Sequence, residues 1–378
     1  MKNERDELTV RSSVEVILKN QSSNGSIVAS PDFAQYGFCW LRDASFIAYS
    51  LDRAGEHEAS GRYHAWVNAA VAGIGDVIDG VIAKKGLGEQ LGVLDMPPAR
   101  FALDGSTVVD DWPNFQIDGY GTWLWSLGEH LTRTGRTSVP EDLRVSVERV
   151  ARYLSTFALS PCYDVWEENG DAQHTSTLAC VYGGLTSASR LLDDGAYRAR
   201  AEEVRTHLVE RANRDGFYVK SSTNGDVDGS TLWLNEPFRV VDVNDERFAT
   251  TVKLIEDRLI LDGGIRRYPT DVYYGSGAWP VLTGSLGWHY VRVGNFDRAE
   301  RCRNWIASHF DENGRLAEQF DGDERDYEHY HEWLLRWGLP AQDLMWSHAM
   351  FIVLSLELDE ASRSTASSAV HEPELGAP

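Results

Sequence analysis

Two kinds of helical segment alternate along the chain, and this alternation constrains the fold more than any other feature. Segments of the first kind carry apolar residues at steps of three and four and a polar opposite face, which is typical of half-exposed helices. One example joins Leu143, Val147, Val150 and Leu154. Segments of the second kind are apolar on almost every side, as in residues 278–292, and indicate helices that are buried all round.

The two kinds form six consecutive pairs. The half-exposed segments lie near residues 10–20, 58–83, 141–157, 195–213, 245–260 and 295–309. The apolar segments that follow them lie near residues 43–54, 120–132, 174–192, 229–236, 278–292 and 341–359. Six such pairs predict an all-α (α/α)6 barrel, in which six outer helices surround six inner helices and a central pocket. Strand patterns are sparse, and the stretch GFYVKSS from Gly216 predicts a small hairpin.

The domain organisation follows from the same pattern. We expect residues 1–360 to form a single (α/α)6 domain, because no linker divides them. Residues 361–378, ASRSTASSAVHEPELGAP, are small and polar and are predicted to form a disordered tail.

The composition argues against several partners and locations. With a net charge of -22, the chain is not expected to bind nucleic acid or an anionic membrane. The start, MKNERDELTV, lacks the apolar stretch of a signal peptide, and no apolar run reaches the roughly 18 residues of a membrane span. The four cysteines have no paired spacing, so we expect buried free thiols and a cytoplasmic location. The oligomeric state stays open.

Unusual residues are concentrated in the connections that lead from an outer helix to the next inner one. These connections are YGFCWLRDASF, NFQIDGYGTW, YDVWEENG, GDVDGSTLW, RRYPTDVYYGSGAW and LAEQFDGDERDYEHYHEWLLRWGLPAQDLMW. In an antiparallel helical barrel they all emerge at one end, and we predict the functional pocket there. The opposite connections, such as RAGEHEASG, are short, polar and free of tryptophan. Aromatic rings beside carboxylates are suited to sugars, because rings cover C–H faces and carboxylates bind hydroxyls.

Some charged residues in these connections also have a purely structural interpretation. The Arg42–Asp43 pair can grip two sugar hydroxyls, or Asp43 can simply cap the following helix. Asp118 and Asp271 can bind a substrate or serve as turn residues next to Gly or Pro.

The aromatic and histidine residues leave similar alternatives. Trp279, Trp288 and Trp346 can be pocket walls or ordinary core residues. His329 and His331 are two positions apart and would not share a helix face, so no metal site is expected there.

Taken together, the motifs resemble glycoside hydrolase family 15, the group of glucoamylases, glucodextranases and isomaltose glucohydrolases. The match is carried by SPDFAQYGFCWLRDASF, QIDGYG, YDVWEE, RYPTDVYYGSGAW, LAEQFD and AQDLMWSHA, in the family's order between residues 30 and 350. The resemblance implies an (α/α)6 catalytic domain and an inverting attack on an α-glucosidic bond at the non-reducing end. It implies no metal or organic cofactor.

The resemblance also implies roles for individual residues. Glu167 resembles the general acid, Glu318 the general base, and Tyr36 a tyrosine near the attacking water. The residues expected to bind substrate are Trp40, Arg42, Asp43, Asp118, Trp166, Glu168, Arg267, Asp271, Tyr273 and Trp279. The loop from Asp321 to Gly338 is long and charged, so Glu324 is an alternative base.

An inverting mechanism makes demands on these two carboxyl groups. They must flank the bond about 6.5–9.5 Å apart, which the adjacent Glu167 and Glu168 cannot do. Burial against Trp166 and the like charge of Glu168 are expected to raise the pKa of Glu167. Nearby arginines and helix N-termini are expected to keep the base ionised.

The expected substrate is a small oligosaccharide. The chain has no candidate starch-binding module and no β-sandwich before the barrel, which favours short α-1,6-linked glucosides such as isomaltose. Alternatives are a glucoamylase-type α-1,4 hydrolase and a trehalose hydrolase. Lower alternatives are a phosphorylase on a related barrel, a non-catalytic sugar-binding protein, and a helical barrel without sugar chemistry.

Overall fold

The computed structural model describes residues 4–211, 213–322 and 326–369, and these residues are mostly helical. The α-helices are α1 (Glu4–Asn20), α2 (Leu41–Arg53), α3 (His57–Gly73), α4 (Gly75–Gly86), α5 (Asp118–Arg133), α6 (Glu141–Phe157), α7 (Thr175–Leu192), α8 (Gly195–Arg211), α9 (Glu246–Leu259), α10 (Pro280–Arg292), α11 (Phe296–Ser308), α12 (Tyr327–Trp337) and α13 (Met345–Ala369). Short 3-10 helices are η1 (Ala34–Tyr36), η2 (Val93–Asp95), η3 (Gly229–Leu234) and η4 (Tyr273–Gly275). The strands form the antiparallel pairs β1 (Cys39–Trp40) with β2 (Arg100–Phe101), β3 (Asn213–Arg214) with β4 (Phe217–Tyr218), and β5 (Ile260–Leu261) with β6 (Gly264–Ile265).

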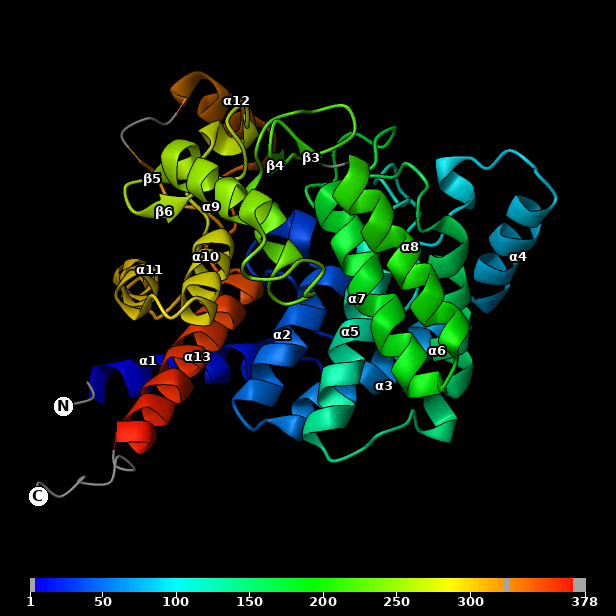
Figure 1. Cartoon of the computed structure of the whole chain (residues 1–378), viewed down its shortest axis with the longest axis horizontal. Coiled ribbons are helices and arrows are strands. Elements are labelled where there is room, and N and C mark those ends of the chain that lie inside the picture. Colours follow the sequence, from blue (N-terminus) through cyan, green and yellow to red (C-terminus); the bar gives the residue numbers. More distant parts are fainter. Residues whose placement is uncertain (1–3, 212, 323–325, 370–378) are drawn as a thin grey trace, which may run out of the picture.

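The inner helices close into a ring. Helix α2 contacts α5, α5 contacts α7, and the ring continues through η3, α10 and α13 back to α2. The outer layer consists of α1, the α3–α4 pair, α6, α8, α9 and α11, each packed on the inner ring (Figure 1). The predicted (α/α)6 barrel is therefore confirmed, and the hairpin predicted around Gly216 is present as β3–β4.

Close packing of the inner helices depends on glycine at the α5–α7 crossing. A Cβ atom on Gly121 would lie 2.4 Å from the carbonyl oxygen of Cys180, and one on Gly184 would lie 2.7 Å from the Cα atom of Gly121. Backbone meets backbone here, so no side chain can move aside. Large aromatic side chains fill the rest of the interior, where Phe46 stacks on Trp346 with ring centroids 5.3 Å apart.

Two elements differ in form from the prediction. The fourth inner helix is only the short 3-10 helix η3, capped by Asp228, whose side chain accepts a hydrogen bond from the Ser230 amide. The outer segment predicted near residues 58–83 is broken between Gly73 and Gly75 into α3 and α4, bent by 59°, because glycine propagates a helix poorly. By length and apolarity, no single helix among the described residues could cross a membrane, although this bent pair passes the test when its halves are combined.

The C-terminal helix is longer than expected. Helix α13 continues to Ala369, so residues 361–369 are helical and the prediction of a disordered tail from residue 361 is wrong for this part. Extending an existing helix costs far less than starting one, and the segment is rich in alanine. Residues 370–378 lie outside the described part of the chain.

Candidate active site

A pocket of about 450 Å3 opens at the end of the barrel where outer helices lead into inner ones. This is the end predicted from the clustering of tryptophan and charged residues. The predicted residues that line it are Tyr36, Trp40, Arg42, Asp43, Trp166, Glu167, Glu168, Arg267, Tyr273, Trp279 and Glu318. Trp346 also lines it and stacks on Phe46, so this tryptophan belongs to both core and pocket, whereas Trp288 packs on Tyr49 away from the pocket.

The carboxyl group of Glu167 contacts two side chains at the start of α2. The indole Nε1 of Trp40 donates a hydrogen bond of 2.6 Å to its Oε1 atom, and Nη2 of Arg42 lies 3.7 Å from the same oxygen. The backbone of Glu167 has a φ angle of 68°, a left-handed conformation that is unusual for a residue other than glycine. Neighbouring groups must therefore stabilise the backbone conformation of the loop that carries Glu167.

Asp164 holds the loop by bonding to its backbone. One carboxylate oxygen, Oδ1, accepts hydrogen bonds from the amides of Trp166 (2.9 Å) and Glu168 (2.8 Å), and the Asp164 carbonyl accepts one from the amide of Glu167. Its other oxygen, Oδ2, lies 2.9 Å from the ammonium of Lys220. Each residue of the WEE triplet is thus bonded to the same aspartate, which fixes where Glu167 points.

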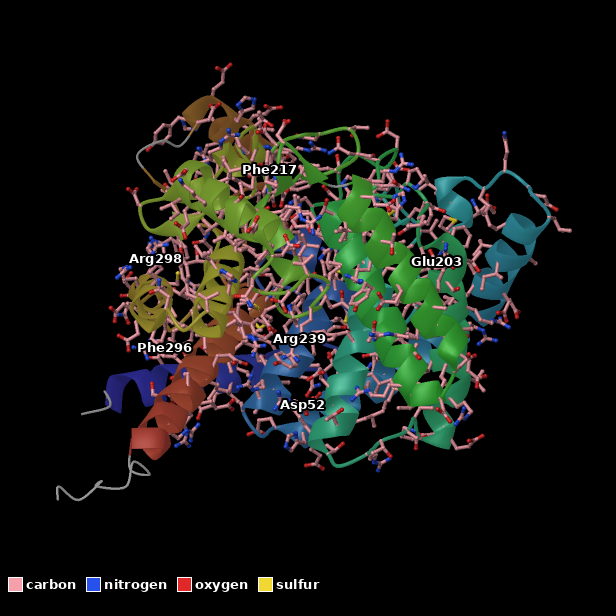
Figure 2. All side chains as sticks on the ribbon, in the orientation of Figure 1. Asp52, Glu203, Phe217, Arg239, Phe296 and Arg298 are labelled. Carbon is pink, nitrogen blue, oxygen red and sulfur yellow. The ribbon has the colours of Figure 1, made fainter. Side chains whose placement is uncertain are left out.

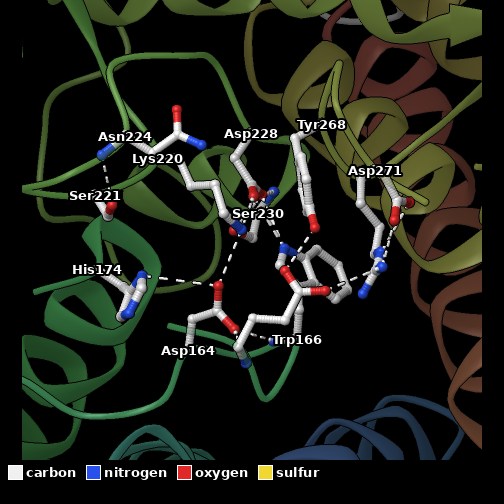
Figure 3. A network of polar contacts seen from close by, with 12 residues as sticks. Asp164, Trp166, His174, Lys220, Ser221, Asn224, Asp228, Ser230, Tyr268 and Asp271 are labelled. Carbon is white, nitrogen blue, oxygen red and sulfur yellow. Dashed lines mark hydrogen bonds and ion pairs between the residues drawn. The ribbon is translucent and has the colours of Figure 1, made fainter. Parts of the chain in front are cut away.

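Lys220 extends this network to a second aspartate (Figure 3). Its ammonium lies 2.9 Å from Oδ2 of Asp228, and the same oxygen accepts a hydrogen bond of 3.0 Å from the indole of Trp166. Burial opposes the charged ammonium, but Asp228 and Asp164 outweigh it and raise the pKa of Lys220. The sequence analysis did not single out Asp164, Lys220 or Asp228. The signal for Asp164 was its place inside the YDVWEE motif.

Glu318 is held by two tyrosines. The hydroxyl of Tyr36 donates a hydrogen bond of 2.7 Å to its Oε1 atom and lies 2.9 Å from the hydroxyl of Tyr273. The other carboxylate oxygen, Oε2, has no hydrogen-bond partner among the described residues, so it is free to accept one from a bound molecule. The alternative base, Glu324, lies outside the described residues.

The two carboxyl groups have similarly shifted pKa values. Desolvation by burial raises the pKa of Glu167 to about 7 against the lowering effects of Arg42 and Trp40, and the like charge that adds to it is Asp43. The expectation that Glu168 supplies that charge is not supported. Desolvation also raises the pKa of Glu318 to about 7, against the lowering effects of the hydrogen bond from Tyr36 and of Arg267, so an arginine favours the ionised base as expected but does not outweigh burial. Burial at 1% exposure outweighs these favourable groups.

In the pairs Arg42–Asp118 and Arg267–Asp271, the arginine faces the pocket and the aspartate lies behind it. Arg42 and Asp43 both line the pocket, and Asp43 does not cap α2, since the capping position is Trp40 without a side-chain bond. Asp118 lies behind Arg42, with Oδ2 3.0 Å from its Nη1 atom. The prediction that Asp118 contacts substrate is therefore wrong, because its side chain is turned into the protein to neutralise and orient the arginine.

Arg267 and Asp271 repeat this arrangement on the other wall. Asp271 accepts a hydrogen bond of 2.9 Å from Nε of Arg267 and lies outside the pocket lining, which corrects its predicted role as a direct binder. Arg267 faces the pocket and lies 3.3 Å from Glu168, whose second oxygen accepts a hydrogen bond of 2.6 Å from Tyr268. Glu168 is thus a fixed acceptor next to Glu167.

The outer rim of the pocket comes largely from residues that sequence reasoning missed. Trp333, Arg336 and Trp337 on α12 and Trp112 from another loop line the pocket. The rings of Trp112 and Trp337 stack at a centroid distance of 6.3 Å. The i,i+4 spacing of Trp333 and Trp337 behind the helix cap Asp326 is the signal that could have found this helix.

Comparison with known proteins identifies the family. Residues 3–293 match the profile described as glycosyl hydrolases family 15. The chain belongs to this family. It is 36% identical to isomaltose glucohydrolase from Kribbella flavida over 355 residues, which cover 92% of each protein. Among solved structures, a glycosidase variant in complex with glucose is 35% identical, with a TM-score of 0.90 over 94% of this chain and 97% of that one.

Family membership makes the chain a glycoside hydrolase that acts on oligosaccharides. The barrel is shared more widely than the sequence: glucoamylase from Saccharomycopsis fibuligera is 16% identical but has a TM-score of 0.73, over 95% of this chain and 97% of that one. In this family 15 chain the arrangement offers two carboxyl groups on separate loops, one close to an arginine and one bonded to tyrosines. It can therefore supply an acid and a base to one bond.

Proposed function

We propose that the protein is an exo-acting, anomer-inverting α-glucoside hydrolase that releases β-glucose from the non-reducing end of short α-1,6-linked glucosides, isomaltose above all. The observation that carries this proposal is that Glu167 and Glu318 line the same pocket, together with aromatic residues such as Trp166, Trp279 and Trp346.

In the proposed reaction Glu167 is the general acid and Glu318 the general base. Glu167 gives its proton to the glycosidic oxygen, while Glu318 takes a proton from a water that attacks the anomeric carbon from the opposite face. The unpartnered Oε2 of Glu318 is the acceptor for that proton, and Tyr36 orients the carboxylate through its other oxygen. Attack from the face opposite the leaving group turns an α-glucoside into β-glucose.

The remaining polar residues are proposed to hold the terminal glucose. Arg42 with Asp43 and Arg267 with Glu168 offer donors and acceptors from two sides of the pocket. Paired groups of this kind match vicinal hydroxyls and place the anomeric carbon between the two catalytic carboxyls. Trp166 and Trp279, with ring centroids 5.6 Å apart, supply apolar wall for the C–H face of the sugar.

The preference for α-1,6 linkages rests on the relative from Kribbella flavida, whose name specifies isomaltose. The test is the initial rate of glucose release from equal concentrations of isomaltose, maltose and trehalose, with and without phosphate. We expect the highest kcat/KM for isomaltose and no effect of phosphate. A preference for maltose would contradict the linkage, and dependence on phosphate would indicate a phosphorylase.

A further inference from the structure

A cluster of polar side chains lies at the barrel end opposite the pocket. Helices α2 and α5 begin at the pocket, where Arg42 and Asp118 pair, and run away from it. Near their far ends they carry Asp52 and His130, and α3 adds His64 beside them. Figure 2 shows Asp52 at the lower end of α2 in that view, far along the helix from the pocket. None of these residues takes part in the proposed reaction.

Asp52 is a buried carboxylate surrounded by donors. Its Oδ1 atom lies 2.8 Å from Nδ1 of His57 and 2.9 Å from Nδ1 of His130, and its Oδ2 atom accepts a hydrogen bond of 2.7 Å from the Ser60 hydroxyl. The Asp52 side chain has no exposed surface. These contacts place an acceptor carboxylate at the centre of the cluster.

His64 is the residue that hydrogen bonding does not explain. It is 1% exposed, and neither of its ring nitrogens has a hydrogen-bond partner among the described residues. A neutral imidazole carries one N–H group and one lone pair, and leaving both unmatched in the interior costs free energy. One nitrogen of a neutral imidazole carries a lone pair, so an unpartnered ring at this place can coordinate a metal ion.

We propose that Asp52, His64 and His130 form a binding site for a divalent first-row transition-metal ion, with Zn2+ the best match. One potential ligand atom from each residue lies within 4.8 Å of the others, so small side-chain rotations bring them onto one ion. Two imidazoles and one carboxylate form a donor set that suits zinc far better than calcium or magnesium, which prefer oxygen.

Coordination also accounts for the surroundings of the cluster. Zinc commonly takes four ligands, and His57, whose side chain is 42% exposed, can supply the fourth ligand or leave that position to water. Its exposed position gives the ion a path from solvent. Coordination through Nδ1 of His130 moves the proton of that nitrogen to Nε2, and the ion then replaces the hydrogen bond to Asp52.

The site would act as a structural cross-link. Its three ligands come from α2, α3 and α5, which contact one another, so a bound ion ties an outer helix to two inner ones. The ion lies at the opposite end of the barrel from Glu167 and Glu318, and this proposal stands independently of the proposed hydrolysis. Its expected effect is on stability, because a ligand that binds the folded state alone raises the unfolding temperature.

The test is titration of the EDTA-treated full chain with zinc chloride by calorimetry, with cobalt chloride as a spectroscopic probe. We expect one tight zinc site, visible absorption typical of low-symmetry Co2+, and a zinc-dependent rise in Tm that EDTA reverses. His64→Gln removes one ligand but keeps a similar size, and should weaken binding by at least about 100-fold, since even outer partners of metal sites contribute up to that factor.

The control is His329→Gln, which removes a surface histidine paired with Asp326 and should bind zinc like the natural chain. If His64→Gln fails to fold by circular dichroism, His130→Gln provides the same comparison. The proposal is overturned if the natural chain takes up no zinc, or if the two ligand variants bind zinc as tightly as His329→Gln.

Discussion

Glu167 and Glu318 have similarly raised pKa values but different neighbours. Glu167 is next to an arginine and an indole donor, while Glu318 is bonded to Tyr36, which also meets Tyr273. With both pKa values raised to about 7, neither role follows from acidity alone. We assign the acid and base roles from the positions of the two residues in their loops and from the unpartnered Oε2 atom of Glu318.

Neutralising either carboxyl group should remove most of the activity. Glu167→Gln keeps the size of the side chain but cannot donate the proton, so kcat should fall by at least the ~10²–10⁴-fold that general acid catalysis contributes. Glu318→Gln should show a comparable loss. Steady-state kinetics on isomaltose would check this, with a surface variant such as Glu312→Gln as a control. Near-normal turnover in either variant would remove that residue from its role.

The same two residues should make stability depend on pH. Each keeps its proton in the folded state up to about pH 7, whereas the ordinary pKa of an exposed glutamic acid is 4.5. Between these values the folded state binds more protons than the unfolded one, so stability falls as the pH rises from 4.5 to 7. The loss is about 3 kcal/mol for each carboxyl.

Thermal unfolding at several pH values tests this prediction. The Tm of Glu318→Gln should decline less than that of the natural chain across this window, and the variant should be the more stable protein at pH 8. Parallel Tm profiles for the two proteins would show that Glu318 does not carry the shift.

At the scale of elements, the loop between α6 and α7 depends on a lysine far along the chain. Lys220 follows β4 and is 4% exposed, yet its charge holds Asp164 and Asp228, and Asp164 shapes the strained loop of Glu167. A buried lysine cannot be recognised from sequence, because its burial depends on carboxylates supplied by other segments. The helical periodicity that predicted the barrel is local, which is why that prediction succeeded.

Lys220→Met should therefore affect both stability and turnover. Removing the cation leaves two buried carboxylates with their hydrogen bonds but without a neutralising positive charge, and breaking a buried ion pair typically costs about 3–5 kcal/mol of unfolding free energy. Loss of the Asp164 anchor should lower kcat more than it raises KM, because the acid loses its position. Denaturant unfolding and kinetics would measure both effects, with the exposed Lys253→Met as a matched control. Normal kcat in a folded Lys220→Met variant would contradict the positioning role.

At the scale of the whole molecule, the sequence predicted the catalytic end of the barrel better than its details. The motifs placed Glu167, Glu318 and both arginines in the pocket lining, since each belongs to a motif that leads from an outer helix to the next inner one. Asp118 and Asp271 were assigned to the substrate because sequence does not say which of two paired charges faces the pocket. The rim helix α12 was missed because its charges concealed the spacing of Trp333 and Trp337.

The barrel is thus a ring of helices with the candidate active site at one end and a histidine cluster at the other.

We propose that two carboxyl groups on separate loops carry out an attack that inverts the anomeric carbon. Proton NMR of fresh enzyme with isomaltose, followed from the first minute, tests this most directly. We expect the β-glucose signal to appear first and the α-glucose signal to increase only later, through mutarotation. Early release of α-glucose would mean retention of configuration and would contradict the assignment of Glu167 and Glu318.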